Sequence, residues 1–376
     1  MYLINIKGIP FLLDYHGLNC YYCSIKIKNI VGETMIEKIY FGKTQNNEDV
    51  YKYVLRTDVA EASILTYGAT WQTFKYLVDG KWVQTNYGYD DITSYETMNG
   101  NFGALVGRNA NRIKGGKFIL SGVEYEVPLT NDWNNLHSGA AAFNKHMFEV
   151  ESVNEEENSI TLTYFSKDMD GGFPGNLNFK VKYTLVKGAL SMEFFAVSDK
   201  NTIMNPTNHA YFNIGCDMLK TELKINSSFI TLAEEHLHTT GEIKSVKGTA
   251  FDFTEFKPIG KDIDADDDQL KLMGGYDVNY CLSSFKEYEK VAVAKNPETG
   301  LTLSVYTDRP GLQLYTSNFL TERVGLDGEK YGYRTGFCLE TQTYSGAAKH
   351  PHFPTPFIKA GEEFYSKTTY ELTIEK

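Results

Sequence analysis

Two side chains in this sequence are of the types that proton transfer needs. Glu340 lies in the stretch G-F-C-L-E-T-Q (Gly336 to Gln342), which is otherwise mostly apolar. His209 lies among asparagines in N-P-T-N-H-A-Y-F-N-I-G (Asn205 to Gly215). A carboxylate and an imidazole that meet at one substrate can remove one proton and deliver another in the same step. Together they predict general acid–base catalysis.

Three further polar stretches could bind and orient a substrate. They are F-G-A-L-V-G-R-N-A-N-R-I (Phe102 to Ile113), N-N-L-H-S-G (Asn134 to Gly139) and G-G-Y-D-V-N-Y (Gly274 to Tyr280). The second is a Gly- and Asn-rich loop that contains His137, and loops carry function more often than strands do.

Each candidate also has a purely structural interpretation. Glu340 could face solvent from an edge strand, and His209 could be a core histidine bonded to the backbone. Asp277 could be only a turn residue after two glycines. Arg108 and Arg112 are four residues apart, so on a strand they would share a face, where one of them could simply form a salt bridge.

The spacing of apolar residues predicts the elements that must position these groups. Apolar and polar residues alternate over 180–185 and again over 190–196, after a turn at Lys187-Gly188, which indicates an antiparallel hairpin with one buried face. Similar runs occupy 160–164, 301–305 and 370–374. Helical periodicity, internal repeats and Pro/Gly/Ser linkers are not evident. We therefore expect an all-β fold, a large antiparallel β-sandwich formed by one domain.

Composition narrows the range of partners. The chain has 376 residues and a formal net charge of -11, without a Lys/Arg-rich tract. Nucleic acid and anionic membrane surfaces both require clustered positive charge, so we expect neither as a partner. No apolar run reaches the ~18 residues of a membrane span. A small neutral molecule would suit this composition.

The cysteines indicate a reducing compartment. Five are scattered along the chain, and only Cys20 and Cys23 form a C-x-x-C, without a second pair to complete a zinc site. The first residues lack a basic segment and a cleavage site, so they do not resemble a secretory signal. We expect a cytoplasmic protein.

Residues 1–34 differ from the remainder. Gly32-Glu33-Thr34 directly precedes Met35. We therefore expect residues 35–376 to form the catalytic domain and residues 1–34 to be an N-terminal extension, with Met35 as the possible true start. The intact mass of natively expressed protein tests this hypothesis.

Two other patterns invite a metal interpretation. His236-Leu237-His238 has a ligand-like spacing but no evident third ligand, so an exposed loop is the expectation. Asp262 to Asp268 is acid-rich, yet it lacks the central Gly and terminal Glu of a calcium loop, so we interpret it as a solvated turn.

Taken in their order along the chain, the polar stretches resemble the signature blocks of the aldose 1-epimerase (galactose mutarotase) family. Further matches are D-G-G-F-P-G-N-L (Asp170 to Leu177), T-G-E-I-x-x-V-x-G-T-x-F-D-F (Thr240 to Phe253) and P-G-L-Q-L-Y-T-S-N-F-L (Pro310 to Leu320). The resemblance covers about residue 35 to the end. It implies a galactose mutarotase-like sandwich that interconverts the α and β anomers of aldohexoses such as galactose and glucose.

The resemblance also implies roles. Glu340 matches the general base on the anomeric hydroxyl, and His209 matches the general acid toward the ring oxygen, on opposite sides of the ring. The residues implied to hold the sugar are His137, Asp277, Arg112, Asn111 and Gln313. No metal and no cofactor is required, because ring opening involves no redox change. A monomer or homodimer is expected.

Three positions depart from the family pattern. Ser138 replaces a usual glycine, Val278 replaces a frequent histidine, and the segment Tyr344 to Lys349 replaces P-D-A-x-N after the base. Both proton-transfer residues are retained, so the departures bear on substrate preference more than on reaction type.

Two alternative functions remain open. A hexose-6-phosphate 1-epimerase would need Arg or Lys residues around a phosphate; the sequence shows no such cluster, although distant residues could assemble one. A non-catalytic sugar-binding or sensing module would not need both Glu340 and His209.

Overall fold

The computed structural model describes residues 2–6, 9–13, 36–130, 132–283 and 286–375. The chain divides into two compact units, Met1–Glu33 and Thr34–Lys376. In the first unit, β1 (Tyr2–Ile6) pairs antiparallel with β2 (Ile9–Leu13). Cys20, Cys23 and Met35 lie outside the described residues, so the expectations about the C-x-x-C and the start of the chain stay predictions.

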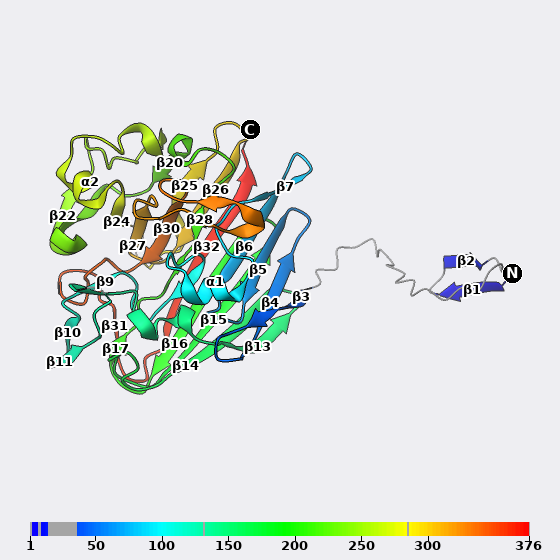
Figure 1. Ribbon diagram of the computed structural model, residues 1–376, viewed down its shortest axis with the longest axis horizontal. Helices are drawn as coiled ribbons and strands as arrows, with labels where there is room; N and C mark the ends of the chain where they lie inside the picture. Colours follow the sequence, from blue (N-terminus) through cyan, green and yellow to red (C-terminus); the bar gives the residue numbers. More distant parts are fainter. Residues whose placement is uncertain (1, 7–8, 14–35, 131, 284–285, 376) are drawn as a thin grey trace. The chain divides into compact units, whose positions relative to one another are not determined.

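Three large antiparallel sheets make up most of the second unit (Figure 1). The nine-stranded sheet contains, in hydrogen-bonded order, β13 (Glu149–Asn154), β14 (Ser159–Ser166), β15 (Leu177–Val186), β16 (Ala189–Ser198), β32 (Phe364–Ile374), β26 (Leu301–Thr307), β25 (Glu289–Lys295), β20 (Glu222–Ile225) and β23 (Lys257–Pro258). The six-stranded sheet contains β19 (Tyr211–Phe212), β30 (Phe337–Gln342), β27 (Gly311–Tyr315), β24 (Asp277–Cys281), β21 (Phe229–Glu234) and β22 (His238–Ser245). The five-stranded sheet contains β3 (Glu37–Lys43), β4 (Asp49–Arg56), β5 (Ala60–Leu65), β6 (Trp71–Val78) and β7 (Lys81–Gln84).

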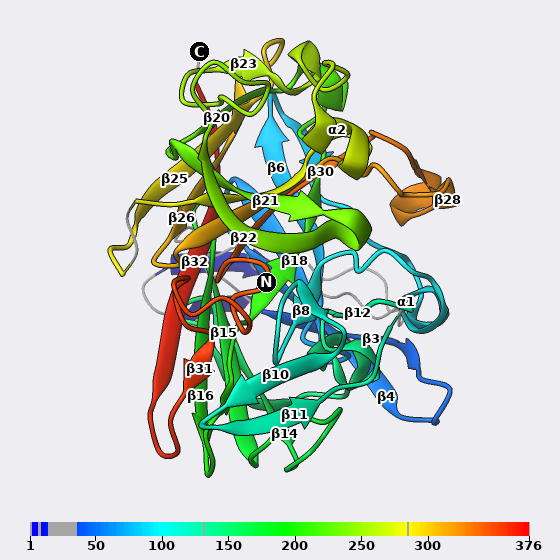
Figure 2. The same ribbon diagram turned by 90° about the vertical axis from the view of Figure 1, so that its left-hand side faces the viewer.

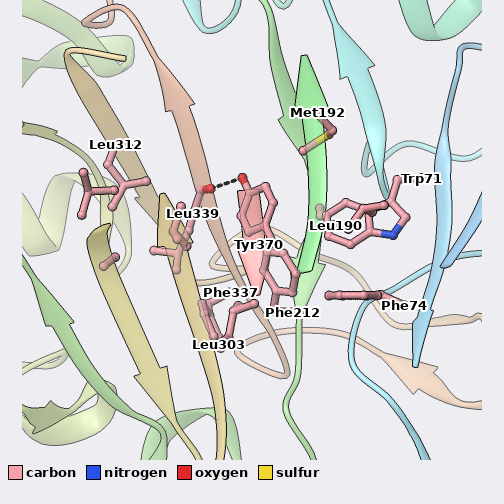
Figure 3. Close-up of a cluster of buried hydrophobic side chains, with 14 of the residues drawn as sticks. Trp71, Phe74, Leu190, Met192, Phe212, Leu303, Leu312, Phe337, Leu339 and Tyr370 are labelled. Atoms are coloured by element: carbon pink, nitrogen blue, oxygen red, sulfur yellow. Dashed lines mark hydrogen bonds between the residues drawn. The ribbon is translucent and has the colours of Figure 1, made fainter. Parts of the chain in front are cut away.

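One hydrophobic core joins the three sheets (Figure 3). Tyr370 of β32, near the middle of the nine-stranded sheet, donates its hydroxyl to the Leu339 carbonyl of β30 at 2.6 Å. Its ring also lies 5.4 Å from the ring of Trp71 on β6. The nine-stranded sheet therefore packs against both smaller sheets, which confirms the predicted all-β sandwich.

Strand periodicity explains this packing. Along β15 and β16, every second side chain is buried, and Tyr183 pairs directly with Met192 across the hairpin. Successive side chains of a strand point to opposite faces, so a period of two buries a single face. The predicted hairpin is confirmed. The runs at 160–164, 301–305 and 370–374 lie in β14, β26 and β32.

Short paired strands, some of which carry the polar stretches, lie outside the three large sheets. The pairs are β18 (Thr207–His209) with β8 (Ala104–Val106), β12 (Asn134–Leu136) with β9 (Arg112–Lys114), β10 (Lys117–Leu120) with β11 (Val123–Glu126), β17 (Thr202–Ile203) with β31 (Phe357–Ile358), and β28 (Arg323–Val324) with β29 (Lys330–Tyr331). Figure 2 shows β8 and β18 between β21–β22 above and the β10–β11 hairpin below.

Helix is scarce among the described residues, where α1 (Ile92–Thr97) and α2 (Asp268–Met273) are short. The acid-rich segment leads into α2, because the Asp267 carboxylate accepts the backbone N–H of Gln269 at 2.8 Å as an N-cap. Several of its side chains are exposed, as predicted for a solvated turn. Neither helix has the length or apolar character to cross a bilayer.

Candidate active site

Strands β24, β27 and β30 form a polar floor. Asn279, Gln313 and Glu340 pair directly across these strands, so their side chains share one face of the sheet. Leu339, the neighbour of Glu340, points the other way into the core (Figure 3). Strand alternation therefore places Glu340 on the polar floor.

Glu340 is a buried carboxyl group with little polar support. Glu340 is 2% exposed to solvent, and its Oε2 atom has no hydrogen-bond partner among the described residues. Burial raises the pKa of Glu340 well above its ordinary value, the nearby charge of Asp277 raises it further, and Arg112 opposes the shift. The edge-strand interpretation is wrong.

His209 lies at the end of β18, beside β30. Its Nε2 atom lies 3.6 Å from Oε1 of Glu340, and its Nδ1 atom lies 3.6 Å from Sγ of Cys338. Tyr211 stacks on the imidazole with ring centroids 5.1 Å apart. Burial lowers the pKa of His209 from 6.5 to about 4. The contacts hold the ring with Nε2 toward the carboxyl group.

Burial therefore opposes charge on both groups. Between the lowered pKa of His209 and the raised pKa of Glu340 the pair holds one proton, because the carboxyl group retains it when the imidazole does not. The same single proton can reside on Glu340 as a neutral pair or on His209 as an ion pair. Acid–base catalysis needs this protonation state, with one donor and one acceptor.

His137 is fixed as a hydrogen-bond donor. Its Nδ1 atom accepts the backbone N–H of Asn111 at 3.1 Å, and the backbone N–H of His137 donates to the Asn111 carbonyl at 3.0 Å. Both residues adopt left-handed backbone, with φ of 52° and 64°. Burial lowers the pKa of His137 well below its ordinary value, and His209 lowers it further. The neutral ring therefore carries its proton on Nε2.

This tautomer bears on whether His137, His209 and Glu340 could together bind a metal ion. One potential ligand atom from each of His137, His209 and Glu340 lies within 4.8 Å of the others, a spacing that a metal ion could bridge. Neither nitrogen of neutral His137 offers a free lone pair, because Nδ1 accepts a hydrogen bond and Nε2 carries the proton. The ring is suited to donate to a substrate oxygen.

Asp277, Arg112 and Gln313 form a hydrogen-bonded group beside this pair. Gln313 Nε2 donates to Asp277 Oδ1 at 2.7 Å, and Arg112 Nη2 lies 3.4 Å from Asp277 Oδ2. Asn111 Oδ1 accepts the backbone N–H of Arg112 at 2.9 Å. The network fixes a carboxylate and a guanidinium at the floor, where both can hold hydroxyl groups.

A family model described as aldose 1-epimerase matches residues 51–371. The chain belongs to the aldose 1-epimerase family. It is 35% identical to the galactose mutarotase of Bos taurus over 331 residues, which cover 86% of this chain and 94% of that relative. It is 33% identical to the aldose 1-epimerase of Escherichia coli K12 over 324 residues, which cover 83% and 92%.

Solved structures of the family share the fold. The galactose 1-epimerase of Lactobacillus acidophilus NCFM superposes with a TM-score of 0.81 at 26% identity, covering 91% of this chain and all (100%) of that one. An aldose epimerase homologue from C. elegans has a TM-score of 0.78 at 26% identity, with the same coverage of each chain. The predicted galactose mutarotase-like sandwich is confirmed.

The structure brings all seven predicted site residues of this family member into one region. Glu340 and His209 face each other, and the network around them contains His137, Asn111, Arg112, Asp277 and Gln313. Asp277 begins β24, so it is not merely a turn residue.

Arg108 and Arg112 do not share a face, contrary to the strand interpretation. Arg108 is buried, and its guanidinium donates to the carbonyls of Pro174 and Gly175, both at 2.8 Å. Asn111, in left-handed backbone, interrupts the regular alternation between the two arginines. Arg108 therefore has a structural role within the family fold.

Sequence reasoning missed Asn279, Gln342 and Ser345. Both amide atoms of Asn279 are buried without a partner among the described residues. Gln342 donates to Gln313 at 3.4 Å, and Ser345, in the departing segment, donates to Asn111 Oδ1 at 2.8 Å. Alternation was the available signal for two of them, because 279 and 342 lie two residues beyond Asp277 and Glu340 on the same face.

The exposed-loop interpretation is wrong for His238, which lies in β22 and is 7% exposed. His236 lies in the preceding turn, and its ring stacks on that of Trp133 with the ring centroids 4.0 Å apart.

Proposed function

We propose that this protein is a mutarotase that interconverts the α and β anomers of an aldohexose such as galactose or glucose. The observation that carries this proposal is the buried pair of His209 Nε2 and Glu340 Oε1, 3.6 Å apart on a polar sheet face. The relatives named galactose mutarotase and aldose 1-epimerase support the same reaction.

In this mechanism the shared proton resides on His209 when the sugar reacts, so Glu340 is the general base and His209 the general acid. Glu340 removes the proton of the anomeric hydroxyl while His209 Nε2 protonates the ring oxygen, and the bond from C1 to the ring oxygen breaks. Rotation about C1–C2 turns the aldehyde, and reversal of both transfers closes the ring as the other anomer. Each complete turnover returns both protons to their original groups.

The short distance within the pair changes the expected arrangement. Two groups whose reacting atoms are 3.6 Å apart cannot lie on opposite sides of a pyranose. They can serve the two oxygens of a hemiacetal, because both oxygens are bonded to the same carbon. During ring opening the pair becomes neutral, which is the state that burial favours.

Five neighbouring residues hold the sugar in this proposal. His137 donates Nε2–H to a hydroxyl oxygen, Asp277 accepts hydroxyl protons, and Arg112 donates to hydroxyl oxygens. Asn111 positions His137 and Arg112, and Gln313 holds Asp277 beside the base. Loss of these groups weakens binding more than proton transfer.

Polarimetry of freshly dissolved α-glucose and α-galactose tests the function. Acceleration on neutral sugars supports it, and Glu340→Gln should reduce that acceleration by roughly 100- to 10,000-fold. Binding without acceleration would instead identify a sugar-binding module and overturn the proposal. We further propose a cytoplasmic monomer or homodimer, which fractionation and light scattering test.

A further inference from the structure

A cavity of about 170 Å³ adjoins the proposed sugar site. It is lined by Arg112 of the site and Lys114, both in β9, and by residues at the end of β21, at the start of β22 and in the segment after β30. Its lining residues are Arg112, Lys114, Glu234, His238, Thr239, Thr240, Gly346, Lys349 and His350. Because Arg112 also contacts Asp277, the cavity and the site share a wall.

The cavity is cationic although the chain carries a net charge of -11. Arg112, Lys114 and Lys349 line it, against the single carboxylate of Glu234. Glu234 forms an ion pair with Lys114 at 2.5 Å, and Asp277 lies 3.4 Å from Arg112, so both of these cations have an acidic partner. Lys349 has no hydrogen-bond or ion-pair partner for its ammonium group among the described residues.

Two groups in the wall lack the contacts that an anion would supply. Lys349 is exposed at the edge of the cavity, where partial burial and the charges of Lys114 and Lys117 lower the pKa of its ammonium group and Glu124 opposes the shift. His238 is 7% exposed, and its Nε2 atom has no partner within the described residues. A buried polar nitrogen without a partner is uncommon and indicates a position for a ligand or water.

The segment that departs from the family pattern forms part of the wall of this cavity. It supplies Gly346 and Lys349, and a Cβ atom at Gly346 would lie 3.1 Å from Cβ of Thr239. Gly346 has a φ of 73°, so a larger residue would be strained as well as crowded. The glycine keeps the cavity open between β22 and Lys349.

We propose that this cavity binds an anionic group, a phosphate or a carboxylate, carried by the sugar whose anomeric centre lies at His209 and Glu340. Lys349 and Arg112 would donate to its oxygens, and His238 would supply a further hydrogen-bonding nitrogen. The inference rests on the proposed mutarotase function and extends its substrate class to sugars bearing an anion.

Mutarotation kinetics of four sugars test the proposal. Glucose, galactose, glucose 6-phosphate and glucuronate separate neutral, phosphate and carboxylate substrates. We expect KM to be about tenfold lower for at least one anionic sugar, since a charge-assisted hydrogen bond is added. Lys349→Gln should remove this advantage, Lys349→Arg should retain it, and neutral sugars should be unaffected. Lys81→Gln, on distant β7, is the matched control.

Calorimetric binding separates failure of this inference from failure of the mutarotase function. Glucose 6-phosphate should bind more tightly than glucose, and Lys349→Gln should abolish the difference, whether or not the protein accelerates mutarotation. A higher salt concentration should weaken the binding of glucose 6-phosphate but not the binding of glucose. Equal affinities for neutral and anionic sugars, or an unchanged preference in Lys349→Gln, would overturn the proposal.

Discussion

His209 and Glu340 contact each other across the junction of β18 and β30, with Nε2 3.6 Å from Oε1. Burial shifts their pKa values in opposite directions, lowering that of the imidazole to about 4 and raising that of the carboxyl group. Each residue therefore titrates outside the range in which its type ordinarily does. Between these two shifted pKa values the pair shares a single proton.

This relationship predicts the pH profile of kcat/KM for a neutral sugar. Activity should fall on the acid side near pH 4, because protonation of His209 while Glu340 holds its proton leaves no base. It should fall on the alkaline side only above the ordinary carboxyl range, when Glu340 loses the shared proton. Polarimetry across pH provides the measurement. An acid limb centred near 6.5 would contradict the assignment.

Glu340→Gln should lower turnover and stabilise the fold increasingly as pH rises. The raised folded-state pKa of Glu340 means that its contribution to stability is present below the unfolded value of 4.5 and is lost at higher pH. Each unit of pKa elevation corresponds to about 1.4 kcal/mol. Urea unfolding across pH measures the difference.

The matched control for this variant is Glu149→Gln at the start of the outer strand β13, where the residue is exposed. It should show no comparable growth in the free energy of unfolding with pH. A constant difference between Glu340→Gln and the parent protein would show that Glu340 does not retain its proton in the folded state.

Asp277→Asn should weaken sugar binding and move the whole pH profile to lower pH. The Asp277 charge raises the pKa values of both Glu340 and His209, so its removal lowers both. KM should rise about tenfold or more, because the Arg112 and Gln313 contacts lose their charged partner. The exposed ion-pair residue Asp264 provides the control variant Asp264→Asn. If the acid and alkaline limbs of the pH profile stay where they are in Asp277→Asn, Asp277 is not electrostatically coupled to Glu340 and His209.

The β-sandwich could be predicted from the sequence because apolar and polar residues alternate wherever a strand buries one face. Tyr183 and Met192 show this rule in β15 and β16. The rule fails where the backbone is irregular, as between Arg108 and Arg112, where left-handed Asn111 reorients the chain. Period-two reasoning cannot assign faces there.

The proton-transfer residues were accessible from the family resemblance, but their electrostatics were not. The low pKa of His209 follows from burial, and burial depends on which segments cover the sheet. The cationic cavity was equally hidden, because Lys114, His238 and Lys349 are far apart in the sequence and meet only in the fold. No local spacing encodes such a cluster.

The two arginines should separate stability from binding. Arg108 is 1% exposed and donates to several backbone carbonyls, so Arg108→Met should leave buried acceptors unpaired and lower the free energy of unfolding by about 3–5 kcal/mol. Folded Arg108→Met should keep the parental KM.

Arg112→Met should instead raise KM with little change in thermal stability, because its side chain lines the site. Thermal unfolding and KM for galactose, measured on both variants, test the division. A raised KM with parental stability in Arg108→Met would show that its guanidinium acts on the substrate site.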